Sequence, residues 1–419
     1  MSAAANNNRV AVVGGARTPF VKSGSTFKNH TALDLGVHAI DGLLAKQNLD
    51  PELVDELMFG IVVADSRIPQ FAREVNFASR LPARTRALTL ADNCITGISA
   101  MAVVHQSISS GRAEIGIAGG VESMSNPTLA FSRRAARKFL DAAAAKTFGD
   151  KVKLLGRLRP SDFKPHAPGI AEPSTGLSMG EHTELMVKEW EIPREEQDEV
   201  AYRSHMNAHA ASTDGRLPAE IHPLDGIGAD LLVRADTSMD KLAKLSPVFD
   251  RTNTGSITAG NSSPLTDGAA AILLMSEARA TKEGCEPLAF IRDFEFAAID
   301  PKDGLLMGPA IAVPRLLRRT NTDLAAFDVV EMHEAFAGQL LCNLKAWKQG
   351  WKEPAIGEVD KDKLNPLGSS IAVGHPFAAT GARIATTLAN EMQRRDAKSG
   401  LISVCGAGAT AAAMILERD

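Results

Sequence analysis

At 419 residues the chain is too long for one ordinary hydrophobic core, so we expect two or three domains. Apolar residues make up 44% and charged residues 23%, a composition typical of soluble globular proteins. The net charge of −4 and the aromatic content of 5% argue against nucleic-acid binding, which needs a basic surface and stacking side chains. No apolar run approaches the roughly 18 to 20 residues of a membrane span.

The cysteines are few and scattered. Cys94, Cys285, Cys342 and Cys405 form no CxxC pair and no His/Cys spacing typical of a metal site. Sparse thiols fit a reducing compartment. The opening "MSAAANNNRVAVV" lacks the basic and long apolar regions of a signal peptide, and "LERD" is not a peroxisomal or prenylation tail. We therefore expect a cytoplasmic protein without a metal or redox cofactor.

The first predicted elements alternate between strand and helix. Residues 9–16, "RVAVVGGA", predict a strand, residues 31–47 an amphipathic helix, and residues 54–64, "VDELMFGIVVA", a second strand. Strands alternating with helices are typical of layered α/β domains.

The two ends of the chain resemble each other. Residues 88–120 predict a strand, a turn, a helix of small residues and a strand, and residues 366–408 repeat this order. Each is preceded by a similar apolar unit, at residues 53–63 and 324–336. Because the unit recurs only once, we infer two duplicated α/β halves and not a solenoid.

A different region separates the halves. Within it, residues 133–164 carry ten basic and three acidic side chains, a local net charge of +7, with apolar residues at helical spacing. This pattern predicts an amphipathic helix whose charged face is simply solvated, or a rim for an anionic ligand, a membrane-surface contact or a contact with a partner subunit.

Four residues could carry chemistry. Cys94 precedes a small-residue helix, where a thiol is either a packing residue or a nucleophile whose pKa the helix N-terminus lowers. His333 ends an apolar run, His375 stands between glycine and proline, and Cys405 lies at the end of a strand, in a flexible glycine/alanine turn. Each of these motifs alone is also compatible with packing.

Taken together, the motifs resemble the thiolase family. "GHPFAATGAR", "HEAFA", "TAGNSSPLTDGAAA" and Cys94 before its helix are colinear with that family over nearly the whole chain. The HEAF form and the basic insert are similar to the β-subunit of the trifunctional fatty-acid β-oxidation complex and its bacterial relatives. The resemblance implies a five-layered αβαβα fold. Its N-terminal half would comprise residues 1–120 and 246–285, its loop domain residues 121–245, and its C-terminal half residues 286–419.

The resemblance also implies catalytic roles. Cys94 would carry the acyl group as a thioester, His375 would take the thiol proton, and Cys405 would be the second acid/base. We expect the helix N-terminus and the histidine to favour a thiolate at Cys94, and a polarised turn to bring the pKa of Cys405 near neutral. One oxyanion site would lie near His333 and His375, with a held water. The other would use the backbone N–H groups of Cys94 and Ala407.

The sequence departs from the commonest family pattern at three positions. Many thiolases have asparagine at the position of His333, glycine at that of Ala407 and serine at that of Thr96. A backbone N–H donor survives the change from glycine to alanine if the dihedral angles are allowed.

The family's contacts with coenzyme A (CoA), which would be a substrate, map onto five positions. The first four would meet the pantetheine arm, and the arginine would meet the nucleotide phosphate through charge-assisted hydrogen bonds. They are Met179, Ala259, Ser263, Phe336 and Arg234. Ser263 could instead cap a helix and Arg234 could be a surface charge. Cys285 and Cys342 match no motif, and we interpret both as packing residues.

The leading hypothesis is a 3-ketoacyl-CoA thiolase that works by a ping-pong cycle, with an acetyl-CoA acetyltransferase as the near alternative. A β-ketoacyl synthase would also use a cysteine and two histidines, but it needs no second catalytic cysteine such as Cys405. A third alternative is a non-catalytic acyl-CoA-binding scaffold. The expected partners are a second copy in a homodimer or homotetramer, a hydratase/dehydrogenase subunit, and a membrane surface at the basic insert.

Overall fold

The computed structural model describes residues 9–169 and 171–419. Most of the N-terminal segment that we compared with a signal peptide therefore lies outside the described residues. The first strand, β1 (Val10–Arg17), is buried over its whole length. It lies between β6 (Thr266–Ser276) and β7 (Ala289–Ala298), so a strand from the start of the chain joins its two halves.

The described strands form one sheet in the order β4-β3-β5-β6-β1-β7-β10-β9-β8, with β2 beside β6. Pairing is parallel for β3 with β4 and β5, and for β8 with β9, and antiparallel elsewhere. The remaining strands are β2 (Val21–Lys22), β3 (Glu56–Gly60), β4 (Arg86–Leu90), β5 (Ile115–Glu122), β8 (Val329–Met332), β9 (Ser399–Gly406) and β10 (Thr410–Glu417).

Two helices lie between the halves of this sheet. These are α3 (Thr96–Ser109) and α13 (Thr380–Arg395), and their apolar residues share one core with strands of both halves. On β1, Val10 and Val12 join this central core, whereas Ala11 and Val13 face an outer one. Strand residues point alternately to opposite faces, so each half of the sheet is buried on both sides.

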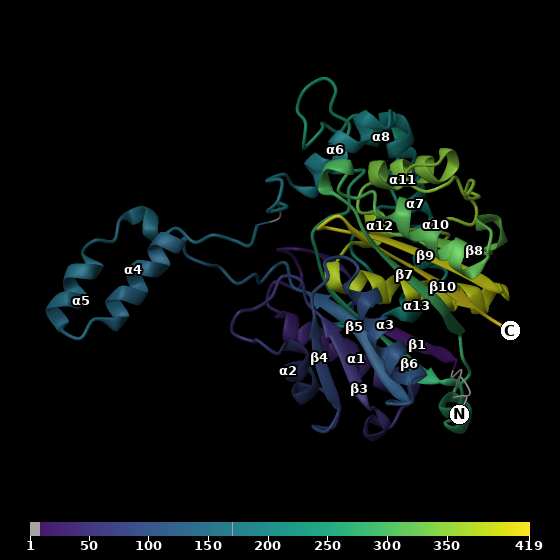
Figure 1. Ribbon diagram of the computed structural model, residues 1–419, viewed down its shortest axis with the longest axis horizontal. Helices are drawn as coiled ribbons and strands as arrows, with labels where there is room; N and C mark the ends of the chain where they lie inside the picture. Colours follow the sequence, from purple (N-terminus) through teal and green to yellow (C-terminus); the bar gives the residue numbers. More distant parts are fainter. Residues whose placement is uncertain (1–8, 170) are drawn as a thin grey trace.

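Two further helix layers complete the five predicted layers. Over the N-terminal half lie α1 (Ala32–Gln47) and α2 (Phe71–Ala78), and over the C-terminal half lie α10 (Pro309–Thr320) and α11 (Ala337–Gln349). The other helices are α6 (Met179–Glu189), α7 (Arg194–Thr213), α8 (Met239–Ala243), α9 (Glu277–Lys282) and α12 (Ser370–Val373). Figure 1 shows α13 between the two halves of the sheet. The αβαβα arrangement is confirmed.

The duplication is confirmed with one correction. In the N-terminal half α3 leads to β5 beside β3, and in the C-terminal half α13 leads to β9 beside β8. The predicted counterpart of β4, however, is not a strand. It is reduced to a single parallel bridge of Leu364 with Val330, and the residues that follow form α12. Serine and glycine in "LGSSIAVG" favour turns over an extended strand.

The basic insert forms a helical hairpin that stands away from the body (Figure 1). It consists of α4 (Arg133–Ala144) and α5 (Phe148–Leu155) and is closed by a short turn at Pro160–Phe163. Asp162 is 3% exposed and accepts hydrogen bonds from Lys138 Nζ at 2.6 Å and Arg159 N at 2.8 Å. The predicted amphipathic helix is therefore two helices, and a buried carboxylate ties α4 to the turn that follows α5. No helix in the described part of the chain is long and apolar enough to cross a bilayer.

The helices α3 and α13 touch through their backbones. A Cβ atom on Gly97 would lie 2.7 Å from the backbone nitrogen of Ala382, and one on Gly381 would lie 2.7 Å from that of Ile98. Only glycine permits this approach at both positions.

We predict that Gly97→Ala lowers the free energy of unfolding by about 1–3 kcal/mol, because overpacking must push the two helices apart. Urea unfolding followed by circular dichroism measures the change. The matched control is Gly149→Ala on α5, where a Cβ would meet nothing within 4 Å. Equal stability of Gly97→Ala and wild type would contradict the proposed helix contact.

Candidate active site

Cys94 is placed by a tight turn between β4 and α3. Asn93 adopts a left-handed conformation with φ of +48°, which asparagine tolerates, and its side-chain Nδ2 donates to the carbonyl of Ala407 at 2.9 Å. The Thr96 hydroxyl donates to the Asn93 carbonyl and accepts from the Asp92 N–H. These bonds fix the sulfur beside the loop that joins β9 to β10.

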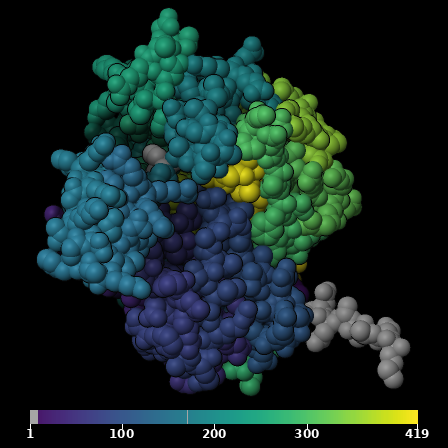
Figure 2. Space-filling model, turned by 60° about the vertical axis from the view of Figure 1, so that its left-hand side comes forward, coloured from purple at the N-terminus to yellow at the C-terminus, as the bar shows by residue number. Residues whose placement is uncertain are grey.

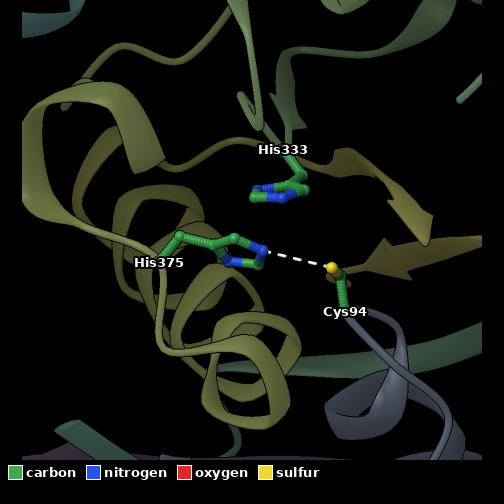
Figure 3. A group of neighbouring side chains, drawn as sticks. All are labelled: Cys94, His333 and His375. Carbon is green, nitrogen blue, oxygen red and sulfur yellow. Dashed lines mark hydrogen bonds between the residues drawn. The ribbon is translucent and has the colours of Figure 1, made fainter. Parts of the chain in front are cut away.

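The two histidines reach Cys94 from the other half of the molecule. His375 Nε2 lies 3.1 Å from Cys94 Sγ, and the imidazole rings of His333 and His375 have centroids 4.1 Å apart. Figure 3 shows His333 at the end of a strand and His375 before a helix, with the His375 ring directed toward the cysteine and the His333 ring beside that of His375. The structure therefore brings together the cysteine and the two histidines that the sequence singled out.

Cys405 belongs to the same cluster. It is the penultimate residue of β9, is 1% exposed, and lies close enough for its charged form to interact with that of Cys94. The backbone N–H of Ala407 hydrogen-bonds to Cys94, as expected for an oxyanion donor. Cys94 alone among the four candidate catalytic residues is partly exposed, so a substrate can reach its sulfur.

Burial keeps the cysteine and the histidines neutral. It raises the pKa of Cys94 to about 12, an effect that the Ala407 N–H opposes and the buried Glu122 carboxylate reinforces. It lowers the pKa of His375 to about 3 and that of His333 well below its usual range. The expected stabilisation of a Cys94 thiolate by the helix N-terminus is therefore wrong for the resting protein, since the cost of burying an ion is larger.

The pKa expected for Cys405 is also corrected. Burial, reinforced by the nearby Cys94, raises it well above the usual thiol value and not toward neutrality. Cys405 lies within a central strand instead of in the glycine/alanine turn, so solvent does not stabilise its thiolate. Both thiols must exchange protons during a reaction and not beforehand.

The predicted CoA contacts fall into two groups. Phe336 packs with Met179, at the first turn of α6, in one apolar cluster, and the ring of Phe249 meets Phe336 edge-on at 6.0 Å. Ser263 donates its N–H to the Ala335 carbonyl, so its loop runs beside the HEAF segment, and Ala259 is exposed in the same loop.

Arg234 forms the second group. It lies exposed in the loop before α8, and its backbone N–H donates to His205 Nδ1 at 3.2 Å. Within the described part of the chain no hydrogen bond joins it to the other four residues. In Figure 2 the yellow C-terminal segment lies at the base of a hollow between the loop region and the two halves.

Several residues of the site had no clear signal in the sequence. Glu122, at the end of β5, accepts hydrogen bonds from the Val62 and Val63 N–H groups at 2.6 and 3.1 Å, and burial raises its pKa to about 7. Glu172 Oε2 accepts from the Gly408 N–H at 2.8 Å in the turn beside Cys94. Only the proximity of Thr380 to His375 within "GHPFAATGAR" could have suggested its contact with that histidine.

The cluster also has the donor atoms of a metal site. The ligand atoms of Cys94, His333 and His375 lie within 4.8 Å of one another, and thiolate with imidazole suits Zn²⁺. A metal held there would bind the sulfur of Cys94 and one imidazole nitrogen of each histidine. A resident metal and a nucleophilic Cys94 would therefore exclude each other.

Cys285 and Cys342 pack as predicted. Cys342 is fully buried in the outer core of the C-terminal half, and Cys285 is partly buried against that of the N-terminal half. All four cysteines are free thiols.

Known proteins match the chain over nearly its whole length. The family described as "Thiolase, N-terminal domain" matches residues 10–278, and "Thiolase, C-terminal domain" matches residues 285–418. The chain is 43% identical to a protein named 3-ketoacyl-CoA thiolase from Colwellia psychrerythraea and 44% identical to one from Serratia proteamaculans. Each comparison covers 98% of this chain and 97% of the relative. The crystal structure of the Bacillus anthracis acetyl-CoA acetyltransferase superposes with a TM-score of 0.85 at 31% identity, covering 98% of each chain.

We predict that Cys94 is a neutral thiol at physiological pH, because its pKa of about 12 leaves almost no thiolate there. The ultraviolet thiolate absorbance of the wild type minus that of Cys94→Ala should stay near zero from about pH 6 to about pH 9 and rise only in stronger alkali. A thiolate band already present at neutral pH would show instead that Cys94 and His375 form an ion pair.

Proposed function

The chain belongs to the thiolase family, and from that premise we propose that it is an acetyl-CoA C-acyltransferase that cleaves 3-ketoacyl-CoA with CoA. The products are acetyl-CoA and an acyl-CoA shortened by two carbons, as in fatty-acid β-oxidation. Full-length relatives that carry the name 3-ketoacyl-CoA thiolase support this activity. The observation that carries it is the 3.1 Å contact of Cys94 Sγ with His375 Nε2 inside a buried site.

The first half-reaction uses the neutral pair. His375 Nε2 takes the Cys94 proton as the sulfur attacks the C3 carbonyl, so charge develops only when the carbon–sulfur bond forms. The N–H groups of Cys94 and Ala407 stabilise the resulting oxyanion. Its collapse breaks the C2–C3 bond and leaves an acyl thioester on Cys94. His333 and His375 stabilise the thioester oxygen of the departing enolate, and Cys405 gives its proton to the C2 carbon, which yields acetyl-CoA.

In the second half-reaction Cys405 acts as the base and His375 as the acid. Cys405, now deprotonated, takes the proton of an incoming CoA thiol, whose sulfur attacks the acyl-Cys94 carbonyl. The N–H groups of Cys94 and Ala407 stabilise the oxyanion that forms on this carbonyl. The carbon–sulfur bond to Cys94 then breaks, and His375 returns its proton to Cys94. CoA is held by Met179, Ala259, Ser263, Phe336 and Arg234.

A short-chain acetyl-CoA acetyltransferase is the alternative that a specific observation favours. The Bacillus anthracis protein of that name shares the whole fold. Its identity to this chain is lower than that of the 3-ketoacyl-CoA thiolases, which supports the degradative function as the first choice. Free thiols at all four cysteines support the proposal of a reducing cytoplasmic location.

Self-association remains part of the proposal. Strand β4 ends the sheet, pairs only with β3 among the described strands, and leaves Leu88 38% exposed. An unpaired edge of this kind is suited to pairing with a second copy across a two-fold axis. This supports a homodimer, or a homotetramer built from dimers.

We predict CoA-dependent cleavage of 3-ketoacyl-CoA substrates with acyl chains from about four to about sixteen carbons. Cys94→Ala should lower kcat by roughly 10⁴-fold or more, and Cys405→Ser by about 10²- to 10⁴-fold. Cys285→Ala is the matched control and should keep wild-type rates. Rates that rise with chain length support the degradative enzyme, and activity confined to acetoacetyl-CoA supports the acetyltransferase. Full activity of Cys94→Ala would refute the mechanism.

The hairpin of residues 133–164 is proposed to contact an anionic membrane surface. Apolar side chains stand exposed on it, with Phe148 83%, Leu140 64% and Val152 53% exposed, among an excess of basic residues. Exposed apolar groups flanked by lysine and arginine are typical of interfacial helices. A hydratase/dehydrogenase subunit remains the other predicted partner of this surface.

We predict that the protein co-sediments with vesicles containing anionic lipid, and less so at high salt. The double variant Leu140→Ser/Phe148→Ser should lose this binding and retain thiolysis of soluble substrate, because the hairpin lies apart from Cys94. Leu185→Ser, another exposed apolar position, is the control. If vesicles do not bind but deletion of residues 133–164 abolishes co-purification of a dehydrogenase subunit, the membrane assignment is wrong and the partner assignment replaces it.

A further inference from the structure

The two facing histidines differ in what holds their Nδ1 atoms. His375 Nδ1 contacts the Thr380 hydroxyl at 2.7 Å, and His333 Nδ1 contacts the Ser370 hydroxyl at 2.8 Å. A hydroxyl has one proton to donate and can also accept, whereas a neutral imidazole carries its proton on only one nitrogen. Besides its histidine, each hydroxyl has one other hydrogen-bond partner in the described part of the chain. Whether that partner accepts or donates indicates which nitrogen of the histidine is protonated.

Beside His375, the other partner of the Thr380 hydroxyl is an acceptor. Thr380 Oγ1 donates its proton to the Pro376 carbonyl at 3.1 Å. Its oxygen must then accept from His375, which places the proton on Nδ1. The Nε2 atom is left with a lone pair 3.1 Å from Cys94 Sγ, and this is the form that can take the thiol proton.

Beside His333, the other partner of the Ser370 hydroxyl is a donor. Arg383 Nη2 donates to Ser370 Oγ at 2.9 Å, and a guanidinium can only donate. The same Nη2 approaches Ser369 Oγ at 3.4 Å, and that hydroxyl donates to the Met332 carbonyl. Among the described residues His333 Nδ1 is the one acceptor within reach of the Ser370 proton, so that proton is directed to Nδ1, which is then the unprotonated nitrogen.

We propose that Thr380 and the Ser370–Arg383 pair hold the two histidines in opposite tautomers, so that His375 is the base and His333 is the hydrogen-bond donor. His333 carries its proton on Nε2, an atom that has no hydrogen-bond partner among the described residues and belongs to a side chain only 1% exposed. The ligand that it fits is a thioester carbonyl oxygen on which negative charge develops. Thr380, Ser370 and Arg383 are positioning residues, and the donor role of His333 rests on the proposed thiolase function.

This assignment explains why two histidines so close together are not redundant. Both are buried and neutral, so their different chemistry cannot come from charge. Asparagine, which many thiolases have at the position of His333, offers an N–H donor without a choice of tautomer. Histidine there donates from Nε2 only in the tautomer with a bare Nδ1, and Ser370 favours that tautomer because Arg383 can only donate to it and leaves its proton for Nδ1.

The direct test is ¹⁵N nuclear magnetic resonance of the full protein labelled in its histidine rings, with His333 and His375 assigned by single His→Gln variants. Protonated and bare ring nitrogens have well-separated shifts. We expect a protonated Nε2 in His333 and a protonated Nδ1 in His375 of the substrate-free protein. A protonated Nδ1 in His333, or a protonated Nε2 in His375, would overturn the proposal whatever the enzyme's activity.

Variants test the positioning roles. Ser370→Ala should shift His333 toward the other tautomer and lower kcat by about 10- to 100-fold, less than the roughly 10²- to 10³-fold expected for loss of an oxyanion donor. KM should change little. Thr380→Val should disturb the His375 signal, and Thr380→Ser should restore both signal and rate. Unchanged tautomers in Ser370→Ala and Thr380→Val would overturn the positioning roles.

The same experiment separates the two proposals. If the tautomers are as stated but no 3-ketoacyl-CoA is cleaved, the thiolase function and the donor role of His333 fail, while the tautomer assignment stands. If thiolysis proceeds and the tautomers are not as stated, only the inference fails.

Discussion

The close contact of α3 with α13 is the constraint on which the site depends. Cys94 stands just before α3 and His375 just before α13, and the two residues are 281 positions apart in the chain. Glycines at positions 97 and 381 let the helix backbones meet in the centre of the molecule. Since each helix belongs to one of the duplicated halves and both pack in one central core, the catalytic contact is a direct product of how these halves face each other.

Burial then determines the chemistry at this contact. A solvated helix N-terminus would favour a thiolate, but here the surrounding apolar and neutral groups raise the pKa of Cys94 and lower those of both histidines. The resting site holds little charge, so the proton leaves Cys94 only when the substrate carbon accepts its sulfur. In such a site the direction of each hydrogen bond carries the functional information that charge would carry elsewhere.

The hairpin and the αβαβα body differ in how far their apolar side chains are buried. The αβαβα body buries its apolar residues between layers, whereas the hairpin of residues 133–164 leaves several exposed and surrounds them with basic side chains. This contrast separates the catalytic body from a surface suited to an external partner. It also lets contacts at the hairpin change without altering the geometry around Cys94.

The sequence was informative where a pattern has a single structural outcome. Buried strands such as β1, the helix after Cys94 and the repeated unit were predictable from periodicity, and the motif order led to the site cluster. The lost counterpart of β4 was not, because one bridge at Leu364 leaves no strand pattern. The shifts in pKa were predicted in the wrong direction, since burial depends on residues brought in by the fold. The roles of Ser370 and Arg383 depend on a contact over 37 positions, between Ser370 and His333, and one over 13 positions, between Arg383 and Ser370, which no local motif reports. The boundaries at residues 120, 245 and 285 remain a prediction.

The central claim is that Cys94 carries the acyl group, and trapping that intermediate tests it most directly. The protein would be mixed with a 3-ketoacyl-CoA in the absence of free CoA, quenched in acid, digested and examined by mass spectrometry. The account predicts an acyl group on the peptide that contains Cys94, and its disappearance when CoA is added before the quench. An acyl group on Cys405, or cleavage of the substrate with no acyl group on any cysteine, would contradict it.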